Sequence, residues 1–96
     1  MAQFITRVEL HEVQSQKENY DKLHEEMGKE GFVRTVLGAN KITYQLPTAE
    51  YYKIGFFTKE QVLESAKRAA MLVDKNFSIL VSETIGLVWM NLKEVK

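Results

Sequence analysis

Two histidines are the side chains of this chain best suited to acid–base chemistry. His11 lies near the end of a stretch predicted to be a strand, and His24 lies in a stretch predicted to be a helix. An imidazole titrates near neutral pH, so either ring could take a proton from a hydroxyl or return one to a leaving oxygen. Glu9 shares one strand face with His11, because residues two apart project to the same side. The two could be acid–base partners, weak metal ligands or solvated surface residues.

Cations and aromatic rings accompany the histidines. Lys22 is two residues from His24 and could hold a phosphate while the histidine moves a proton. Arg34, Lys41 and Tyr44 combine charge and rings, as platforms for single-stranded nucleic acid do. The catalytic candidates are thus His11, His24 and Lys22, and the RNA-binding candidates are Lys22, Arg34, Lys41 and Tyr44. The same residues also fit a solvated helix face, an ordinary strand surface or a buried dimer interface.

Several kinds of site are excluded by composition. The chain has no cysteine, which rules out disulfides, thiolate metal sites and a cysteine nucleophile. It has no H-E-x-x-H, no glycine-rich phosphate loop and no G-x-S-x-G, so we expect no nucleotide cofactor. We predict no metal site, although a divalent ion stays open as an alternative. A chain without cysteine needs no oxidising compartment, and we therefore expect a cytoplasmic protein.

Length and charge narrow the function classes further. The 96 residues are expected to form one domain, residues 1–96. Its 13 basic and 13 acidic side chains cancel, which argues against a bulk nucleic-acid or membrane-surface binder. Apolar runs are only a few residues long, so no membrane segment is expected. The segment 31–55 nevertheless has a local excess, with Arg34, Lys41 and Lys53 against Glu50.

Two segments have the apolar spacing of amphipathic helices, and both begin with a capping-box pattern. The first starts with S-x-x-E at Ser15 and can end at Gly31 in the left-handed conformation. The second starts with T-x-x-Q at Thr58, and its alanines, such as Ala66 and Ala69, would let it lie close to a sheet. Strand patterns occupy the remaining segments, at residues 4–13, 32–37, 42–46, 51–57, 77–81 and 85–92.

The order of these elements predicts the fold class. If residues 38–40 are only a bulge or small turn, the chain is a βαββαβ pattern with an extra C-terminal strand at 85–92. This predicts an α+β, ferredoxin-like sandwich, in which two helices cover one face of an antiparallel sheet. The uncovered face is expected to present Arg34, Tyr44, Tyr51 and Lys53. A bare sheet face and a terminal strand that can pair with a second copy predict a homodimer.

The chain resembles a known family over most of its length. The carrying segments are FITRVELHEV at 4–13, YDKLHEEMGKEGF at 20–32, ITYQLPTAEYYKI at 42–54 and FTKEQVL at 57–63. Together they are similar to the GhoS-type antitoxin family of type V toxin–antitoxin systems, from about Thr6 to Ala70. The resemblance implies a ferredoxin-like fold, related to the folds of VapD-type ribonucleases and of the CRISPR-associated small integration subunit.

The resemblance also implies an activity. The named antitoxin is a sequence-specific endoribonuclease that cuts messenger RNA of its toxin. Its relatives hold a divalent metal with an acidic residue at the end of the first strand, where this sequence has His11, flanked by Glu12. Lys22 and His24 occupy what look like the basic positions of the family's first helix.

The sequence therefore supports two main hypotheses about function. The first is a dimeric, antitoxin-like bacterial or prophage protein that binds single-stranded RNA and possesses metal-free endoribonuclease activity. Lys22 and Arg34 would bind phosphate, and His11 or His24 would act as general base or acid. The second is a non-catalytic homodimeric protein-interaction module, which zero net charge favours. A small-molecule binding domain fits the fold class as a third interpretation, with no motif behind it.

Overall fold

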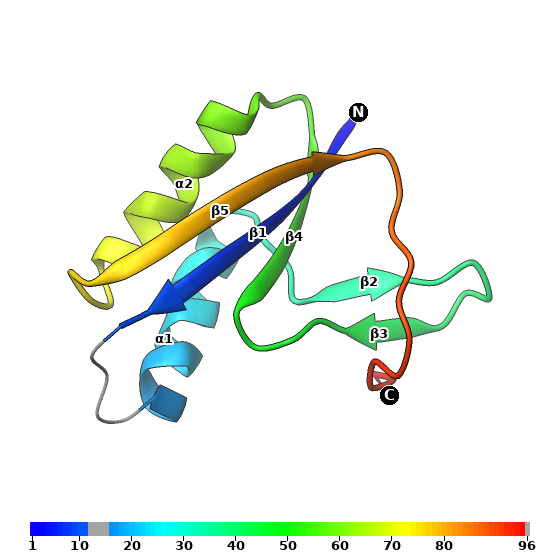
Figure 1. Ribbon diagram of the computed structural model, residues 1–96, viewed down its shortest axis with the longest axis horizontal. Coiled ribbons are helices and arrows are strands. Elements are labelled where there is room, and N and C mark those ends of the chain that lie inside the picture. Colours follow the sequence, from blue (N-terminus) through cyan, green and yellow to red (C-terminus); the bar gives the residue numbers. More distant parts are fainter. Residues whose placement is uncertain (12–15, 96) are drawn as a thin grey trace.

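The computed structural model describes residues 1–11 and 16–95, and within them the chain forms two helices and five strands. In chain order the elements are β1 (Ala2–Leu10), α1 (Gln16–Lys29), β2 (Thr35–Leu37), β3 (Thr43–Gln45), β4 (Glu50–Gly55), α2 (Lys59–Met71) and β5 (Phe77–Thr84). The predicted α+β class is confirmed, and the arrangement is compatible with a small ferredoxin-like fold (Figure 1).

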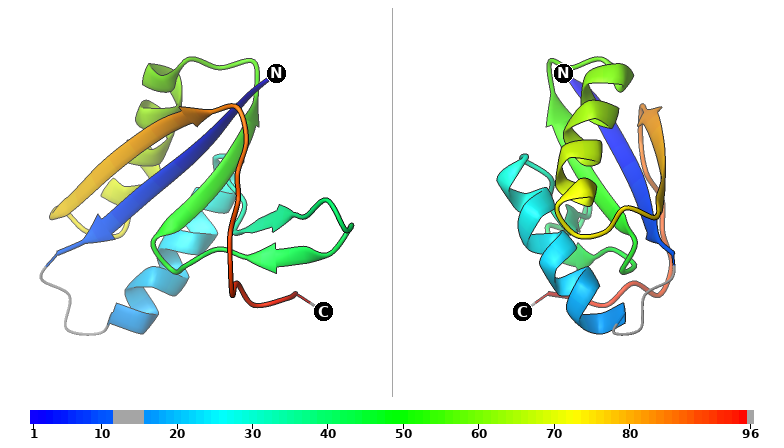
Figure 2. Two further views of the ribbon diagram at one scale, coloured as in Figure 1. Left: turned by 45° about the vertical axis from the view of Figure 1, so that its right-hand side comes forward. Right: turned by 90° about the vertical axis from the view of Figure 1, so that its left-hand side faces the viewer.

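The strand β1 is the centre of a three-stranded antiparallel sheet whose order is β4-β1-β5. Its register pairs Ile5 with Tyr52 of β4 on one side and with Ser82 of β5 on the other. Because side chains alternate across a strand, Phe4 and Val8 share one face, and both are fully buried. Both helices lie on that face of the sheet (Figure 2), which leaves the opposite face without a helix.

The hydrophobic core lies between the sheet and the two helices. Its buried members are Phe4, Val8, Leu10, Leu23, Met27, Phe32, Tyr51, Val62, Ala66, Ala69 and Ala70. The alternation of β1 and the helical spacing of α1 and α2 bring these side chains together, as the sequence pattern predicts. Full burial of each large apolar side chain contributes about 1.5–3 kcal/mol, so this cluster is the main source of stability.

The predicted start of the second helix and the predicted end of the first helix are confirmed. Thr58 Oγ1 accepts a hydrogen bond from the backbone N–H of Gln61, and Gln61 Oε1 accepts one from the backbone N–H of Thr58, which completes the capping box of α2. At the end of α1, Gly31 has φ 91° and the Phe32 N–H donates to the Met27 carbonyl. The capping pattern at Ser15 lies outside the described residues.

The middle of the chain forms a second sheet, which corrects the prediction of one sheet. Val33 bridges to Tyr52 of β4, but the chain then leaves that sheet, and β2 pairs with β3 around a turn in which Lys41 has φ 66°. A turn, and not a bulge, therefore separates the two strand patterns. At the point of departure, the Arg34 guanidinium donates to three carbonyl oxygens of residues 46–50, between β3 and the start of β4.

The predicted C-terminal strand at 85–92 does not form. This segment has no strand partner, and it runs from the end of β5 towards the β2–β3 hairpin (Figure 1). There the backbone N–H of Gln45 donates to the carbonyl of Lys93, and Val95 N–H donates to the carbonyl of Thr43. The aromatic ring of Trp89 packs against Tyr44 with 5.5 Å between ring centroids. Ile85, Val88 and Met90 are exposed, so the ring contact of Trp89, and not sheet pairing, joins the segment 85–92 to the hairpin.

The predicted composition of the uncovered sheet face is also wrong, because Arg34 and Tyr44 lie outside the three-stranded sheet and the other two residues face the helices. Tyr51 and Lys53 point towards the helices and are buried, with 0% and 8% of their surface exposed. Tyr52 and Ile54, which alternate with them, lie on the uncovered face. The Lys53 ammonium lies 4.9 Å from the ring centroid of Phe32 and donates to the Glu30 carbonyl. Such a site for lysine needs several segments to meet, which alternation alone could not indicate.

Candidate functional site: a cleft beside the first helix

A cleft of about 660 Å³ lies between α1, the end of β1 and the segment that follows β3. Two of the predicted site residues, His24 and Arg34, line it together. His24 comes from α1 and Arg34 from the stretch just before β2, so the fold brings these two segments to one place. The other charged residues that line the cleft are Arg7, Glu9, Lys17 and Asp21.

His24 is the group in this cleft best prepared for proton transfer. Its Nδ1 atom lies 2.6 Å from the hydroxyl oxygen of Tyr51, and the two rings meet edge to face with 5.5 Å between centroids. Burial lowers the pKa of His24, and the positive charge of Arg34 lowers it further. The imidazole is therefore held in its neutral form around neutral pH, which is the form that can accept a proton.

Tyr51 fixes the orientation of that imidazole. Its side chain is fully buried, and burial raises the pKa of its phenol well above the ordinary value. The hydroxyl therefore stays protonated and can act as donor or acceptor towards His24. The guanidinium of Arg34 lies over the same ring, 5.5 Å from its centroid, and opposes that rise in pKa through its charge.

Arg34 has a structural task as well as a place in the cleft. Its Nη1 atom donates to the carbonyl oxygens of Leu46, Pro47 and Glu50 at 3.0, 2.7 and 2.9 Å. Burial lowers the pKa of Arg34, but a guanidinium remains charged in a protein. These three bonds hold the loop that forms one wall of the cleft. The remaining face of the guanidinium supplies positive potential beside His24.

The other two cations of the cleft are paired with carboxylates. Arg7 bonds to Glu9 and lies 3.3 Å from the Glu50 carboxylate, and Lys17 Nζ lies 3.2 Å from the Asp21 carboxylate. The hydrogen bond from Arg7, followed by its charge, lowers the pKa of Glu9. The rim of the cleft therefore carries nearly balanced charge, in line with the net charge of zero for the whole chain.

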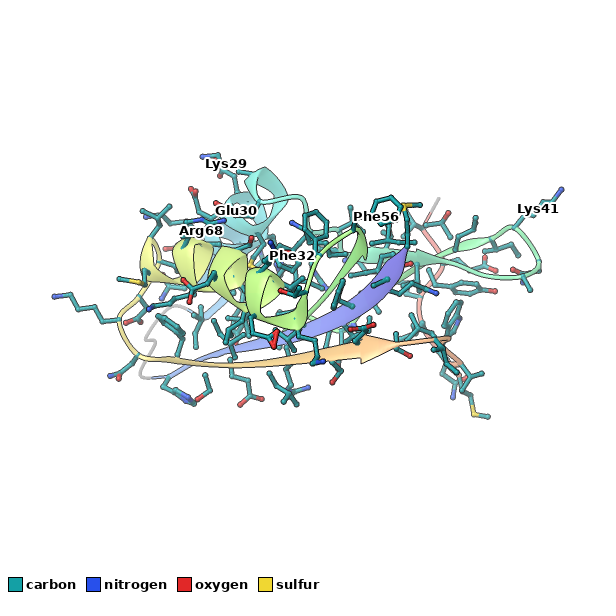
Figure 3. The ribbon with its side chains drawn as sticks, turned by 90° about the horizontal axis from the view of Figure 1, so that it is seen from above. Lys29, Glu30, Phe32, Lys41, Phe56 and Arg68 are labelled. Carbon is teal, nitrogen blue, oxygen red and sulfur yellow. The ribbon has the colours of Figure 1, made fainter. Side chains whose placement is uncertain are left out.

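The four remaining predicted residues lie outside this cleft. His11 is exposed at the end of β1, where its Nε2 atom lies 2.7 Å from Ser78 Oγ of β5. Lys22 is exposed on α1 and does not line the cleft. Lys41 extends from the tip of the hairpin (Figure 3), and the Tyr44 hydroxyl accepts a hydrogen bond from Asn40. Glu12, beside His11, lies outside the described residues.

The sequence prediction missed several residues of the cleft. Tyr20 lies four residues before His24, on the same helix face, and its hydroxyl accepts the backbone N–H of Leu10. The spacing of four residues between Tyr20 and His24 is enough to predict from the sequence that both side chains lie on the same side of the helix. Tyr51 had no such signal, because Tyr52 follows it and a pattern of two tyrosines does not say which of them faces the helices. Arg7 and Lys17 resembled ordinary surface residues.

Within the described residues, no group of three or more His, Cys, Asp or Glu side chains lies close enough together to hold a metal ion. Neither helix there is both long and apolar enough to cross a lipid bilayer. Comparison of the chain with protein-family models gives no match, and comparison with curated proteins also gives none.

Proposed function

We propose that this protein binds single-stranded RNA and cleaves it, as an antitoxin-like endoribonuclease of the GhoS type in the bacterial cytoplasm. The observation that carries the proposal is the neutral, oriented imidazole of His24, hydrogen-bonded to Tyr51 inside a cleft that also contains Arg34. The proposed fold is the ferredoxin-like one. The isolated bridge between Val33 and Tyr52 of β4 supports this fold. It places the chain just before β2 beside β4, as a fourth member at that edge of the β4-β1-β5 sheet.

The proposed reaction uses the 2′-hydroxyl of the RNA itself. In the proposed tautomer, the Nδ1–H group of His24 donates a hydrogen bond to the Tyr51 hydroxyl. The unprotonated Nε2 atom is then the base that removes the 2′-hydroxyl proton. The 2′ oxygen then bonds to the adjacent phosphorus while the bond from phosphorus to the 5′ oxygen breaks. The 5′ oxygen takes up a proton, which balances the one held by His24, and the products are a 2′,3′-cyclic phosphate and a 5′-hydroxyl. Arg34 stabilises the charge that develops on the phosphate oxygens.

The exposed cations have a supporting part in this proposal. Lys22 on α1 and Lys41 at the hairpin tip would contact backbone phosphates of a bound strand outside the cleft, as the ring of Tyr44 would contact a base. Binding through phosphates releases counterions, so the affinity for RNA is expected to fall steeply as salt concentration rises. An apolar protein interface would show little such dependence.

The decisive experiment compares the two histidines. The purified protein is incubated with a panel of single-stranded RNAs in the presence of a chelator, and 2′,3′-cyclic phosphate ends are measured. His24→Ala is expected to lower the cleavage rate by about 100-fold or more. His11→Ala, the matched control outside the cleft, is expected to leave the rate unchanged. A panel left intact by the parent protein, or equal losses in both variants, would contradict the proposal.

A second candidate function is the non-catalytic homodimeric interaction module. It is favoured by apolar side chains on the side of the sheet without helices, where Leu80 is 65% exposed and Ile54 47% exposed. Leu80 lies on β5, which pairs only with β1 among the described strands and so has an open edge, whereas Ile54 lies across the sheet on β4. The occupant we propose is a second copy, because antiparallel pairing lets an edge strand pair with itself about a two-fold axis.

Sedimentation analysis of the parent protein and of Leu80→Lys tests this second candidate. A dimer in the parent that becomes a monomer in Leu80→Lys would support it, since a buried unpaired ammonium is costly. Leu63→Lys on α2, where the side chain is 40% exposed, is the matched control and should keep the dimer. A monomeric parent protein would rule the dimer out.

A further inference from the structure

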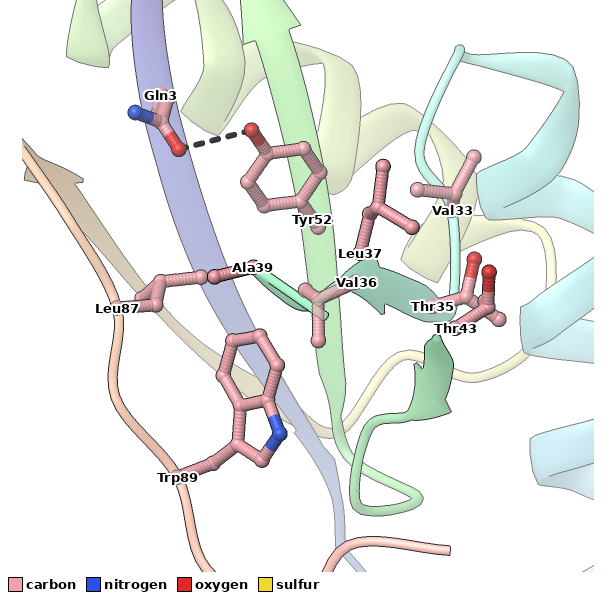
Figure 4. Close-up of a pocket in the computed structure, with 10 residues that line it drawn as sticks. All are labelled: Gln3, Val33, Thr35, Val36, Leu37, Ala39, Thr43, Tyr52, Leu87 and Trp89. Atoms are coloured by element: carbon pink, nitrogen blue, oxygen red, sulfur yellow. Dashed lines mark hydrogen bonds between the residues drawn. The ribbon is translucent and has the colours of Figure 1, made fainter. Parts of the chain in front are cut away.

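A second concavity shares no lining residue with the His24 cleft, and neither the catalytic proposal nor the dimer proposal uses it. It has a volume of about 450 Å³, within the range of about 300–1,000 Å³ that is usual for small-molecule sites. Its walls are the β2–β3 hairpin, the uncovered face of the sheet at Tyr52 and the C-terminal segment at Leu87 and Trp89 (Figure 4).

The lining of this pocket carries no formal charge. Charged residues make up 27% of the chain, yet none of the ten lining residues is charged. The apolar part of the wall comes from the side chains of Val33, Val36, Leu37, Ala39 and Leu87. A phosphate or carboxylate in this position would lose hydration without gaining a counter-ion. The pocket therefore favours an uncharged ligand.

The polar and aromatic groups of the pocket suit a flat ring. Tyr52 and Trp89 supply aromatic surface, and the Tyr52 hydroxyl is held in place by a hydrogen bond of 2.9 Å to Gln3 Oε1. That bond is the one drawn between the lining residues in Figure 4, so the Thr35 and Thr43 hydroxyls have no partner in the lining. These hydroxyls can each donate and accept, which matches the amide-like edges of a heteroaromatic ring.

The wall that contains Trp89 is held in place by contacts outside the pocket. Its indole packs against Tyr44, and backbone hydrogen bonds join Lys93 to Gln45 and Val95 to Thr43. A ring that enters therefore meets an aromatic surface that is already ordered, which reduces the entropy lost on binding.

We propose that this pocket binds one uncharged planar heteroaromatic ring of the nucleobase class. The ring stacks against the aromatic surface of Tyr52, and its edge bonds to the hydroxyls of Thr35 and Thr43, which share one face of the β2–β3 hairpin. Trp89 closes the pocket from another side. The sugar and any phosphate remain outside, in solvent. The ring can belong to a free nucleoside or to an unpaired base of a bound strand, and only the second source rests on the proposed RNA function.

Trp89 is the only tryptophan of the chain and lines this pocket, so its fluorescence reports on binding there, and the pocket-filling variant described below separates that signal from contacts at the neighbouring Tyr44. The protein is titrated with adenosine, with uridine and with ribose 5-phosphate, which lacks a base. A single-stranded RNA hexamer is titrated into His24→Ala, so that binding is measured without cleavage. We expect saturable changes with at least one nucleoside or with the hexamer, and none with ribose 5-phosphate.

Variants of the wall connect the signal to the proposed contacts. Thr35→Val with Thr43→Val keeps the shape and removes both hydroxyls, and is expected to weaken binding about tenfold or more. Ala39→Phe, which fills the pocket, should abolish binding. Ser82→Ala removes an exposed hydroxyl on β5, away from the pocket, and should change nothing.

The outcomes separate this inference from the proposed function. Nucleoside binding without any RNA cleavage supports the pocket while the endoribonuclease proposal fails. Binding of the hexamer alone, lost in Ala39→Phe, supports the pocket with the strand as its source. Cleavage that depends on His24 with no saturable signal from nucleosides or the hexamer overturns the pocket and leaves the endoribonuclease standing. Binding that is unchanged in Ala39→Phe overturns the pocket as well.

Discussion

The imidazole of His24 and the phenol of Tyr51, 27 residues apart in the chain, are joined by a hydrogen bond of 2.6 Å at the floor of the cleft. Tyr51 is fully buried in the core, so this bond connects the cleft directly to the packing of the sheet against α1. The histidine is oriented by a group that cannot move without disturbing the core. This relationship leads to two predictions, one on pH and one on stability.

The stability of the protein should depend on the titration of His24. Burial lowers its pKa in the folded state below the ordinary 6.5, so the unfolded chain binds the proton more readily. The stabilisation is therefore complete above about pH 6.5 and is lost as the pH falls through the lower, folded-state pKa. Urea unfolding between pH 7.5 and pH 5 should show this loss. His24→Gln should reduce the slope of this pH dependence; equal slopes in the parent protein and in His24→Gln would refute the link.

Removing the hydroxyl of Tyr51 should lower the free energy of unfolding more than removing the hydroxyl of Tyr52. Tyr51→Phe leaves the Nδ1 atom of a half-buried imidazole without its partner, and we expect a loss of about 1–3 kcal/mol in the free energy of unfolding. Tyr52→Phe removes only the bond to Gln3 on the more open face, and should cost about 1 kcal/mol or less. Denaturant unfolding of the two variants measures the difference. A larger loss in Tyr52→Phe would contradict the arrangement.

Arg34 should matter for stability, while Lys41 should not. The guanidinium bonds to three carbonyls, and hydrogen bonds from charged groups are worth about 1.5–3 kcal/mol each when both partners are buried. Because one of the bonds is exposed and the two Nη1 hydrogens are shared among three carbonyls, the bonds do not add in full, and we expect Arg34→Met to lower the free energy of unfolding by about 2 kcal/mol or more. Lys41→Met at the exposed hairpin tip should stay within about 0.5 kcal/mol. Equal effects in thermal or urea unfolding would count against the clamp by Arg34.

Replacing each of two glycines at the end of α1 by alanine should change the free energy of unfolding in opposite directions. Gly28 lies inside α1 with no atom within 4 Å of an added Cβ, so Gly28→Ala should stabilise the protein by about 0.5–1 kcal/mol. Gly31 has φ 91°, and its Cβ would lie 3.2 Å from Lys53 Nζ, so Gly31→Ala should destabilise it. Urea unfolding of both variants tests the pair, and a shift in the same direction for both would show that the end of α1 is misplaced.

The helices and the central strand are predictable because their information is local. The spacing of Leu23 and Met27, the capping box at Thr58 and the alternation along β1 each depend on residues a few positions apart. The C-terminal segment is different, because an apolar run of strand length forms a strand only where a free edge accepts it. Here the side chain of Trp89 packs against Tyr44. The first backbone pairing after β5 is the bridge between Glu94 and Tyr44.

The sequence by itself determined the α+β class, both helices, the start of the second helix and the end of the first, the position of β1 and the presence of a histidine suited to proton transfer. Only the tertiary structure decided that Tyr51, and not Tyr52, faces the helices, because a shift of one residue exchanges the two faces of a strand. It alone also joined His24 to Arg34 and separated both from His11, Lys22, Lys41 and Tyr44. The reason is physical: local spacing sets which face of an element is apolar, but which polar groups meet depends on how distant elements pack against each other.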